Sequence, residues 1–239
     1  MKDISDKRVN ISLDNPSITF DKSKCDECGI CKNICKINVG VYEFSKDNYP
    51  CINCGSCTLA CPKKCLSEKD ETDKLEEYLH SNKVIVMQTA PAVRVSLGEE
   101  FGMKLGTNVE GKMITALRTI GADYVFDTTF GADLTVMEEA NELVNRIKTG
   151  KNLPMFTSCC PSWVKFCEMF YPECLDNLST CKSPISMMGS IINNYFCKIN
   201  NLKREDIISI TIVPCTSKKT EILKYNDIDL AITTRELAK

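Results

Sequence analysis

One closely spaced cysteine pattern occurs twice near the N-terminus of this chain of 239 residues. Each copy reads Cys-x-x-Cys-x-x-Cys-x-x-x-Cys, and the chain has sixteen cysteines in all. Because soft thiolates select zinc, copper(I) or iron–sulfur clusters, the pattern predicts a metal-binding segment. The cysteines of the two copies are Cys25, Cys28, Cys31, Cys35, Cys51, Cys54, Cys57 and Cys61.

The spacing and its duplication are typical of bacterial ferredoxins that bind two 4Fe-4S clusters. Three cysteines of each copy bind one cluster, and the fourth reaches the other cluster. Gly29 and Gly55 follow the second cysteine of each copy, where a side chain would crowd the cluster and glycine permits a tight turn. We assign Cys25, Cys28, Cys31 and Cys61 to one cluster, and Cys51, Cys54, Cys57 and Cys35 to the other. Two clusters this close predict an electron relay.

A pair of zinc knuckles is the competing interpretation of these cysteines. Zinc sites use two Cys-x-x-Cys pairs that lie a dozen or more residues apart. A third cysteine two residues on and then a fourth, in both copies, fit that spacing poorly. Lys36 departs from the ferredoxin pattern, because it follows Cys35 where Pro62 follows the last cysteine of the second copy. We interpret the additional thiol of Cys65 as a packed side chain.

The composition sets the chemical context of these cysteines. The chain is 43% hydrophobic and 26% charged, which is globular, and its net charge of −2 gives no sign of nucleic-acid binding. The sequence contains no apolar run long enough to predict a membrane span. The first ten residues lack the apolar core of a signal peptide. We therefore expect a cytoplasmic protein, in which many cysteines indicate metal ligation or redox chemistry rather than disulfides.

The remainder of the chain has a different pattern, in which short apolar strands alternate with helices. This alternation predicts an α/β layer with a mainly parallel sheet. We therefore expect an α+β ferredoxin-like two-cluster domain at residues 1–70, a linker at 71–82 and an α/β domain at 83–239. The expected strands are residues 84–88, 124–126, 155–157, 207–213 and 229–232, and the expected helices are residues 111–120, a helix capped by Asp133, residues 184–197 and a helix from Thr234.

Two further cysteine-containing strings follow expected strands of this α/β part. TSCCPSW carries Cys159 and Cys160, and VPCTSKK carries Cys215 and Lys218. Open α/β sheets place their ligand sites beyond the carboxyl ends of strands, so the strings mark a candidate thiolate metal site. Buried free thiols are the alternative, because cysteine is among the most buried residue types. We apply that interpretation to Cys167, Cys174, Cys181 and Cys197.

The same strings resemble the first two signatures of the iron-only (FeFe) hydrogenase family. FTSCCPSW and VPCTSKK carry the resemblance, and TAPAVR, TTFGADLTVMEEA and DLAITTRELA are also similar to that family. The resemblance extends from the ferredoxin-like motif to the last residue. It implies reversible oxidation of dihydrogen to protons and electrons, with the electrons relayed through two 4Fe-4S clusters to a ferredoxin or similar carrier.

The resemblance also implies roles for individual residues. In the family the cofactor of the active site, called the H-cluster, is a 4Fe-4S cluster joined through a cysteine to a two-iron centre. Maturation proteins supply the two-iron centre. By position Cys160 and Cys215 would bind the 4Fe-4S part, and Cys159 would be the proton-transfer thiol. Lys218 would donate a charge-assisted hydrogen bond to a cyanide ligand. The outward proton path would pass from Cys159 to Glu139, Ser179 and Glu142.

The carboxylates and the serine also have plain structural interpretations. Glu142 and Arg146 are four residues apart on an expected helix and fit an ordinary surface ion pair. Ser179 fits a cap for the helix that follows it. Without the family resemblance these interpretations are favoured, and with it the proton path is favoured.

The chain departs from the family pattern at three places. Val213 replaces the usual methionine before the second-signature proline, and Ile185 replaces the usual glutamine after Ser-Pro, which suggests a variant branch. The third signature holds two more cysteines, and no cysteine follows Cys215 in this sequence. We therefore expect an incomplete hydrogenase catalytic domain, truncated before the third signature, that turns over no hydrogen by itself.

Three functions compete for the chain. The first is a hydrogenase, with dihydrogen and protons as substrates. The second is a non-catalytic electron-transfer module, and the third is a hydrogen sensor or an iron–sulfur assembly factor, because the family has such relatives. The presence of Cys159, Glu139, Ser179 and Glu142 favours the hydrogenase.

Overall fold

The computed structural model of the chain describes residues 7–41 and 50–239. The contacts divide the chain into two compact units. Unit 2 comprises Asp70–Cys160, Asp176–Pro214 and Glu221–Lys239, and unit 1 comprises Met1–Lys69, Pro161–Leu175 and Cys215–Thr220. The first division falls between Lys69 and Asp70, and the two later segments of unit 1 come from the part of the sequence expected as the α/β domain. The expected domain bounds stay a prediction.

Unit 1 is built from short elements around a two-stranded antiparallel sheet, in which Thr19 of β1 pairs with Ser67 of β2. Each copy of the cysteine pattern contains a short helix that begins directly after a glycine. Gly29 and Gly55 have φ values of +81° and +79°, a conformation that glycine adopts without strain. The glycines thus permit the tight turns that the sequence predicts. The elements are β1 (Ile18–Phe20), η1 (Lys22–Lys24), α1 (Ile30–Ile34), the π-helical η2 (Cys35–Val39), α2 (Ser56–Ala60), β2 (Leu66–Glu68) and α7 (Pro161–Phe170).

Unit 2 contains a four-stranded parallel sheet with the order β4-β3-β5-β6. Its strands are β3 (Val84–Thr89), β4 (Tyr124–Asp127), β5 (Ile207–Val213) and β6 (Leu230–Thr233). The parallel sheet and four of the five expected strands are thereby confirmed. The fifth, at residues 155–157, is only an isolated parallel bridge between Phe156 and Leu178.

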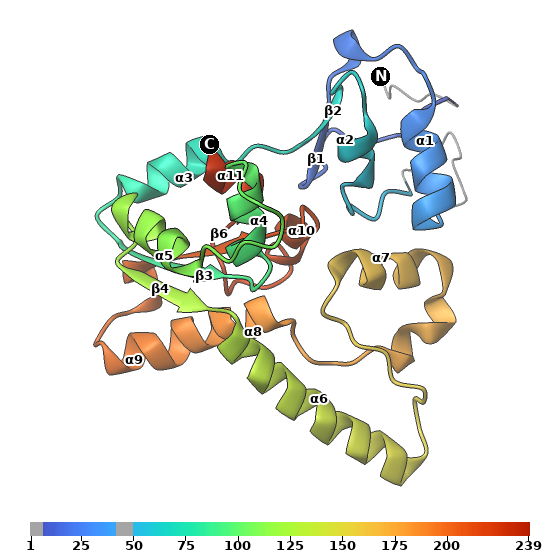
Figure 1. Ribbon diagram of the computed structural model, residues 1–239. Helices are drawn as coiled ribbons and strands as arrows, with labels where there is room; N and C mark the ends of the chain where they lie inside the picture. The colour runs from blue at the N-terminus through green and yellow to red at the C-terminus, as the bar shows by residue number, and fades with distance from the viewer. Residues whose placement is uncertain (1–6, 42–49) are drawn as a thin grey trace. The chain divides into compact units, whose positions relative to one another are not determined.

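Helices cover both faces of this sheet (Figure 1). In β5, Ile208, Ile210 and Ile212 belong to the larger apolar core with side chains of α3, α4 and α5, while Ile207 packs on the other face with residues of α8 and η4. The alternation follows from the two-residue period of a strand. The helices on the two faces are α3 (Thr72–Leu79), α4 (Val93–Glu100), α5 (Glu110–Thr119), α11 (Thr234–Ala238), α8 (Pro184–Ile191), the π-helical η4 (Ile192–Phe196) and α9 (Cys197–Ile199). The helix α3 occupies most of the segment expected as a linker.

The sequence explains several helix ends. Ser183 caps α8 by accepting the backbone N–H of Ser186, and Pro184 begins that helix. Thr233 and Glu236 form a reciprocal capping box at α11, whose start at Thr234 was expected. Two short turns, η3 (Pro172–Asn177) and η5 (Arg204–Asp206), and the helix α10 (Lys218–Glu221) complete the described elements.

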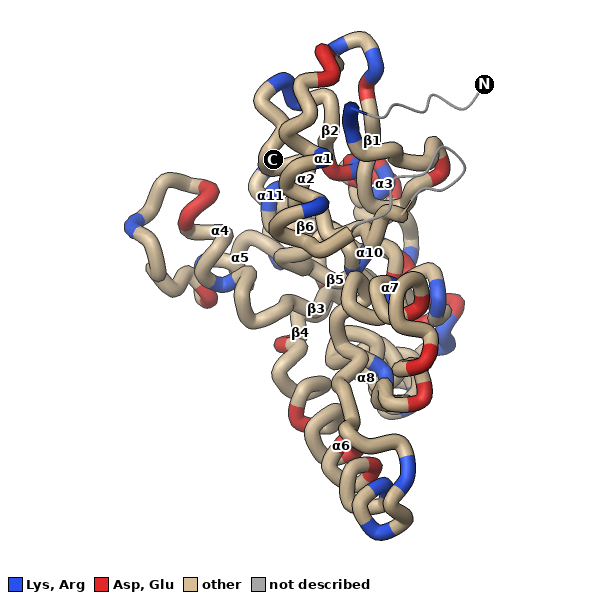
Figure 2. Tube along the Cα trace, turned by 90° about the vertical axis from the view of Figure 1, so that its right-hand side faces the viewer, with Lys and Arg blue, Asp and Glu red and all other residues tan. Residues whose placement is uncertain are grey.

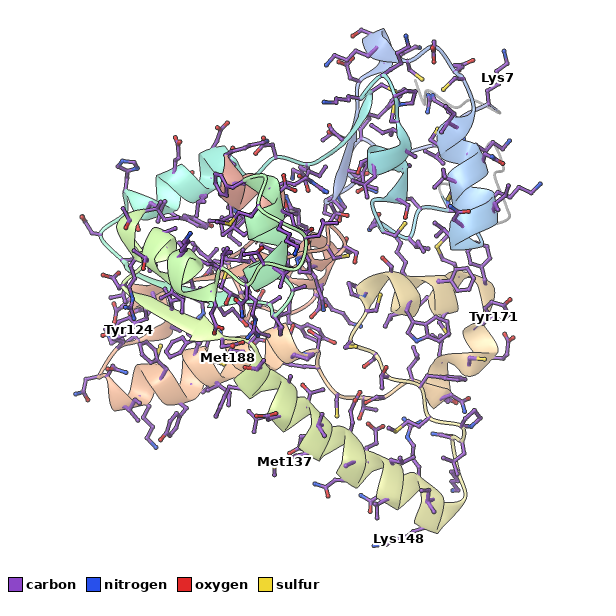
Figure 3. All side chains as sticks on the ribbon, viewed as in Figure 1. Lys7, Tyr124, Met137, Lys148, Tyr171 and Met188 are labelled. Atoms are coloured by element: carbon purple, nitrogen blue, oxygen red, sulfur yellow. The ribbon has the colours of Figure 1, made fainter. Side chains whose placement is uncertain are left out.

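The longest helix, α6 (Thr129–Thr149), differs from its expected form. It begins four residues before Asp133, which therefore lies inside the helix and does not cap it. Gly131 permits a close approach to α8, because a Cβ there would lie 2.4 Å from the carbonyl oxygen of Pro184. Apolar residues recur along this helix at helical spacing, yet Met137 is 63% and Ile147 60% exposed. Figure 3 labels Met137 on this helix.

Charges of both signs are interspersed along the trace (Figure 2), in keeping with the net charge of −2. No helix in the described part of the chain is both long and apolar enough to cross a membrane.

Candidate functional site

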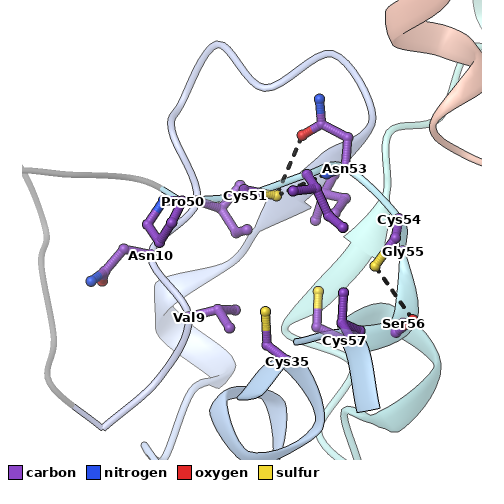
Figure 4. A pocket seen from close by; sticks show the side chains of 14 residues that line it. Val9, Asn10, Cys35, Pro50, Cys51, Asn53, Cys54, Gly55, Ser56 and Cys57 are labelled. Carbon is purple, nitrogen blue, oxygen red and sulfur yellow. Dashed lines mark hydrogen bonds between the residues drawn. The ribbon is translucent and has the colours of Figure 1, made fainter. Parts of the chain in front are cut away.

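The second cysteine loop of unit 1 surrounds a small cavity. Cys51, Cys54 and Cys57 line it together with Cys35, which comes from the first copy of the pattern. Figure 4 shows the four sulfur atoms around the same space. Most of the other lining residues are apolar, and they include Val9, Ile11, Ile18, Val39, Pro50 and Ile52. The set of thiols is the one that the crosswise ferredoxin pattern predicts for a single cluster.

Hydrogen bonds and burial shape these thiols. Cys51 Sγ accepts from the backbone N–H of Asn53 at 3.4 Å and from Asn15 Nδ2 at 3.7 Å. Burial, followed by the neighbouring thiols, raises the pKa of Cys35 to about 12, and the same two causes raise the pKa of Cys57. Without metal these groups therefore stay neutral, whereas a bound cation would favour the thiolates.

The thiols assigned to the other cluster also lie near one another. Cys25 and Cys28 both act electrostatically on Cys31, and Cys61 Sγ lies 3.2 Å from Cys65 Sγ. Across residues 7–41 and 50–239, no three His, Cys, Asp or Glu side chains are close enough to hold one metal ion.

The segment that carries Cys215 packs directly on the second cysteine loop within unit 1. Thr216 Oγ1 donates to the carbonyl of Asn53 at 3.3 Å, and Asn53 Nδ2 donates to Thr220 Oγ1 at 2.9 Å. A Cβ on Gly55 would lie only 2.5 Å from Thr216 Oγ1. The tight turn explains only part of the need for glycine at this position, because this contact joins residues more than 150 positions apart and cannot be inferred from the local sequence.

The other expected active-site residues are found at loop ends. Cys215 is half-buried, and its sulfur lies 3.0 Å from Ser217 Oγ. The backbone N–H of Lys218 donates to the carbonyl of Cys215, so the lysine begins α10 one turn beyond the thiol. Cys159 and Cys160 are both exposed, immediately before α7. Because Cys160 belongs to unit 2 and Cys215 to unit 1, the structure describes the two predicted ligands separately.

Two members of the expected proton path are hydrogen-bonded in unit 2. Ser179 Oγ donates to Glu142 Oε2 at 2.8 Å, and the backbone N–H of Thr180 donates to the same carboxylate. Ser179 therefore does not cap α8, a role that belongs to Ser183. Glu139 lies one helical turn before Glu142 on α6 and is half-buried. The steps from Cys159 to Glu139 and from Glu139 to Ser179 stay predictions.

Arg146 holds this carboxylate in place. Its guanidinium donates to Glu142 Oε1 from Nη2 at 2.6 Å and from Nε at 3.1 Å. The two side chains are only 10% and 16% exposed, so the pair is not the surface pair that spacing alone suggests. Arg146 also donates to the backbone carbonyls of Asn152, Asp176, Asn177 and Leu178.

The charge on Glu142 is stabilised by its partners. Burial opposes ionisation, but the hydrogen bonds from Ser179, Arg146 and the Thr180 N–H outweigh it and lower the pKa of the carboxyl. A group with a lowered pKa stabilises the fold above its unfolded-state pKa, and that stability is lost as the pH falls through the folded-state value.

We expect Glu142→Gln to cost about 1–3 kcal/mol at neutral pH, because the amide cannot satisfy Arg146 fully. The unchanged chain should lose part of its stability as the pH falls below about 4, where unfolded glutamate is protonated, and the variant should lose less. Anaerobic urea unfolding at several pH values measures both effects. Glu138→Gln on the exposed side of α6 is the control, and an equal cost for the two variants would contradict the assignment.

The two residues that replace the family's usual methionine and glutamine lie in the same apolar cluster. Ile185 and Val213 are 3% and 1% exposed and belong to one apolar cluster with Ile228 and Ala231. The backbone carbonyl of Ile185 accepts a hydrogen bond from Gln88 Nε2. The two substitutions are therefore neighbours in the core of unit 2, which their separation in the sequence does not suggest.

Comparison with known proteins gives consistent matches. The model of the iron only hydrogenase large subunit, C-terminal domain, matches residues 83–239. Iron hydrogenase 1 of Clostridium pasteurianum is 42% identical over 259 aligned residues, which cover 98% of this chain and 45% of that protein. Among solved structures, the apo [FeFe]-hydrogenase HydA1 from Chlamydomonas reinhardtii, variant C377H, aligns with a TM-score of 0.68 and 34% identity, covering 71% of this chain and 47% of its own.

Some relatives have names that do not describe a hydrogenase. The human nuclear prelamin A recognition factor is 30% identical over 79% of this chain and 46% of its own length. The chain thus spans about half the length of the relatives that it matches. Resemblance at this level fixes the family and the α/β fold, while the activity needs further argument.

Proposed function

The chain belongs to the iron-only hydrogenase family, and from this premise we propose that it supplies the electron relay and part of the active site of a hydrogenase. The reaction is the reversible conversion of dihydrogen into protons and electrons. We further propose that the chain acts in the cytoplasm, with a ferredoxin or similar electron carrier as its partner and with maturation proteins that supply the two-iron centre.

The position of Cys35 carries the proposal. It lines the same cavity as Cys51, Cys54 and Cys57, although it belongs to the first copy of the motif. An exchange of the fourth cysteine between copies is the property that separates two-cluster ferredoxins from paired zinc knuckles. The apolar walls and the hydrogen bonds to sulfur suit a buried 4Fe-4S cluster.

The expected active-site residues and the residues of the proton path receive roles from the same proposal. When bound, the H-cluster supplies the chemistry that cleaves dihydrogen. Cys160 and Cys215 hold its 4Fe-4S part, and Lys218 orients a cyanide ligand by a charge-assisted hydrogen bond. Cys159 exchanges the proton with the site, and Glu139, Ser179 and Glu142 carry it outward. The bond between Ser179 and Glu142 supports the last step of this path.

The packing of the Cys215 segment supports a route for the electrons. Thr216 and Thr220 contact Asn53, which lies between two cysteines of the second loop. The cluster held by Cys51, Cys54, Cys57 and Cys35 is therefore the one next to Cys215, and electrons pass through it before the other cluster.

A non-catalytic role is the second candidate, favoured by relatives whose names do not describe a hydrogenase, such as the human nuclear prelamin A recognition factor. An electron-transfer or hydrogen-sensing protein would retain the relay without turnover. We favour the hydrogenase because the thiol, the serine and both carboxylates of the proton path are all present.

Infrared spectroscopy of the anaerobically purified chain, produced together with the maturation proteins, tests the proposal. Iron analysis and electron paramagnetic resonance (EPR) spectra of the reduced chain should show two 4Fe-4S clusters, and zinc in their place would refute the relay. Carbonyl and cyanide bands would show that the two-iron centre assembles on this chain. Clusters without these bands and without hydrogen turnover would favour the non-catalytic candidate, and Cys160→Ala should leave those two clusters unchanged in either case.

A further inference from the structure

Cys65 is the one cysteine of residues 1–69 that lies outside the two motif copies. Its side chain is only 5% exposed, and its sulfur lies 3.2 Å from Cys61 Sγ. It also lies close enough to Cys25 for the two thiols to interact electrostatically. The two neighbours come from different copies of the motif and are both assigned to the same cluster. Cys65 is therefore packed, as the sequence suggests, and it lies beside two thiols that are assigned to one cluster.

The backbone holds Cys65 at this place. The N–H of Lys64 donates to the carbonyl of Cys61 at 3.2 Å, and Lys64 has a φ of +50°, so the chain turns back tightly. The carbonyl of Cys65 then accepts the N–H of Asp21 at 2.8 Å, just before the segment that leads to Cys25. These two backbone hydrogen bonds thus hold the Cys65 sulfur beside Cys61 and Cys25.

We propose that Cys65 is a second thiol ligand for the iron atom that Cys61 binds, so that either cysteine can complete this cluster. The inference rests on the proposed function of the motif as a two-cluster site. In the exchange the iron–sulfur bond to Cys61 breaks and a bond to Cys65 forms, while the proton of the Cys65 thiol passes to the Cys61 sulfur. No electron is gained or lost.

In the described part of the chain, no spare thiol occupies the corresponding place beside the cluster of Cys35, Cys51, Cys54 and Cys57. Cys61 and Cys35 occupy the same place in their motif copies, and Cys65 and Val39 each lie four residues further on. Val39 lines the cavity of Cys35 and offers no ligand. The duplicated motif therefore provides a natural control, because loss of Cys35 has no thiol to compensate for it.

Variants of the full chain test this exchange after anaerobic reconstitution with ferrous iron and sulfide. We expect Cys65→Ala and Cys61→Ala each to retain the iron and sulfide of the unchanged chain. The double variant and Cys35→Ala should each lose iron from one cluster, with the EPR signal of a 3Fe-4S centre after oxidation or the loss of roughly half of the cubane iron. Circular dichroism checks that every variant is folded, and Cys61→Ser replaces Cys61→Ala if the latter is not.

The outcomes separate this inference from the function on which it rests. If the unchanged chain holds no pair of cubanes, the proposed function and the exchange both fail. If it holds both, but Cys61→Ala loses iron as extensively as the double variant, only the exchange is refuted. Retention in Cys61→Ala and loss in the double variant would establish Cys65 as a ligand.

Discussion

Alanine at Gly55 is expected to destabilise unit 1 by about 2–4 kcal/mol, and this cost has two separate causes. The first is the φ of +79°, which an alanine adopts only with strain of about 1 kcal/mol or more. The second is the overlap of the new Cβ with Thr216 Oγ1 at 2.5 Å, which belongs to the overpacking class of about 1–3 kcal/mol. Rotation of the threonine would relieve the overlap only by losing its hydrogen bond to Asn53. Anaerobic chemical unfolding measures the total.

The duplicated motif supplies the matched control for this variant. Gly29 has almost the same φ, +81°, but the nearest atom to a Cβ there is 3.5 Å away. Gly29→Ala should therefore show the backbone cost alone. Thr216→Ala removes the overlapping oxygen, so Gly55→Ala should cost less in that background. Equal costs for the two glycines, or no coupling between Gly55 and Thr216, would show that the Cys215 segment does not pack on this loop.

The grouping of Cys35 with the cysteines of the second loop and the positions of the strands were predictable from the sequence, because both depend on local rules. A thiolate motif fixes which residues approach a cluster, and the glycine after its second cysteine follows from the turn. The run from Ile207 to Val213 is rich in β-branched residues, and β5 has those bounds. Parallel pairing followed from alternation with helices. None of these inferences required knowledge of distant contacts.

Other features depend on contacts that the sequence does not reveal. The apolar spacing of Met137 and Ile147 gave the helix α6, but periodicity cannot say whether a partner covers that face. The segment of Cys215 was assigned to the α/β part by its neighbours along the chain, whereas its contacts lie with Asn53 and Gly55. The closeness of Ile185 and Val213 is also a result of tertiary packing.

The burial of Arg146 is a fourth such feature, and it gives the largest expected effect in unit 2. Arg146→Met should destabilise the chain by about 3–5 kcal/mol, because it removes a buried guanidinium and leaves the half-buried carboxylate of Glu142 without its cation. The variant also removes a donor from four backbone carbonyls between Asn152 and Leu178. The segments on both sides of the Cys159–Cys160 pair should consequently become more susceptible to limited proteolysis. Anaerobic urea unfolding gives the free energy of unfolding.

A second substitution separates the effect of the unpaired Glu142 charge from the effect of losing the Arg146 side chain. In Glu142→Gln the stranded negative charge is absent, so adding Arg146→Met to that variant should cost less than adding it to the unchanged chain. Arg118→Met, on the exposed side of α5, controls for the loss of any arginine and should cost less than about 0.5 kcal/mol. If Arg146→Met costs no more than Arg118→Met, the ion pair does not organise this region. Since the charge of Glu142 depends on Arg146, the same variant should also raise the pKa of the carboxyl that ends the proposed proton path.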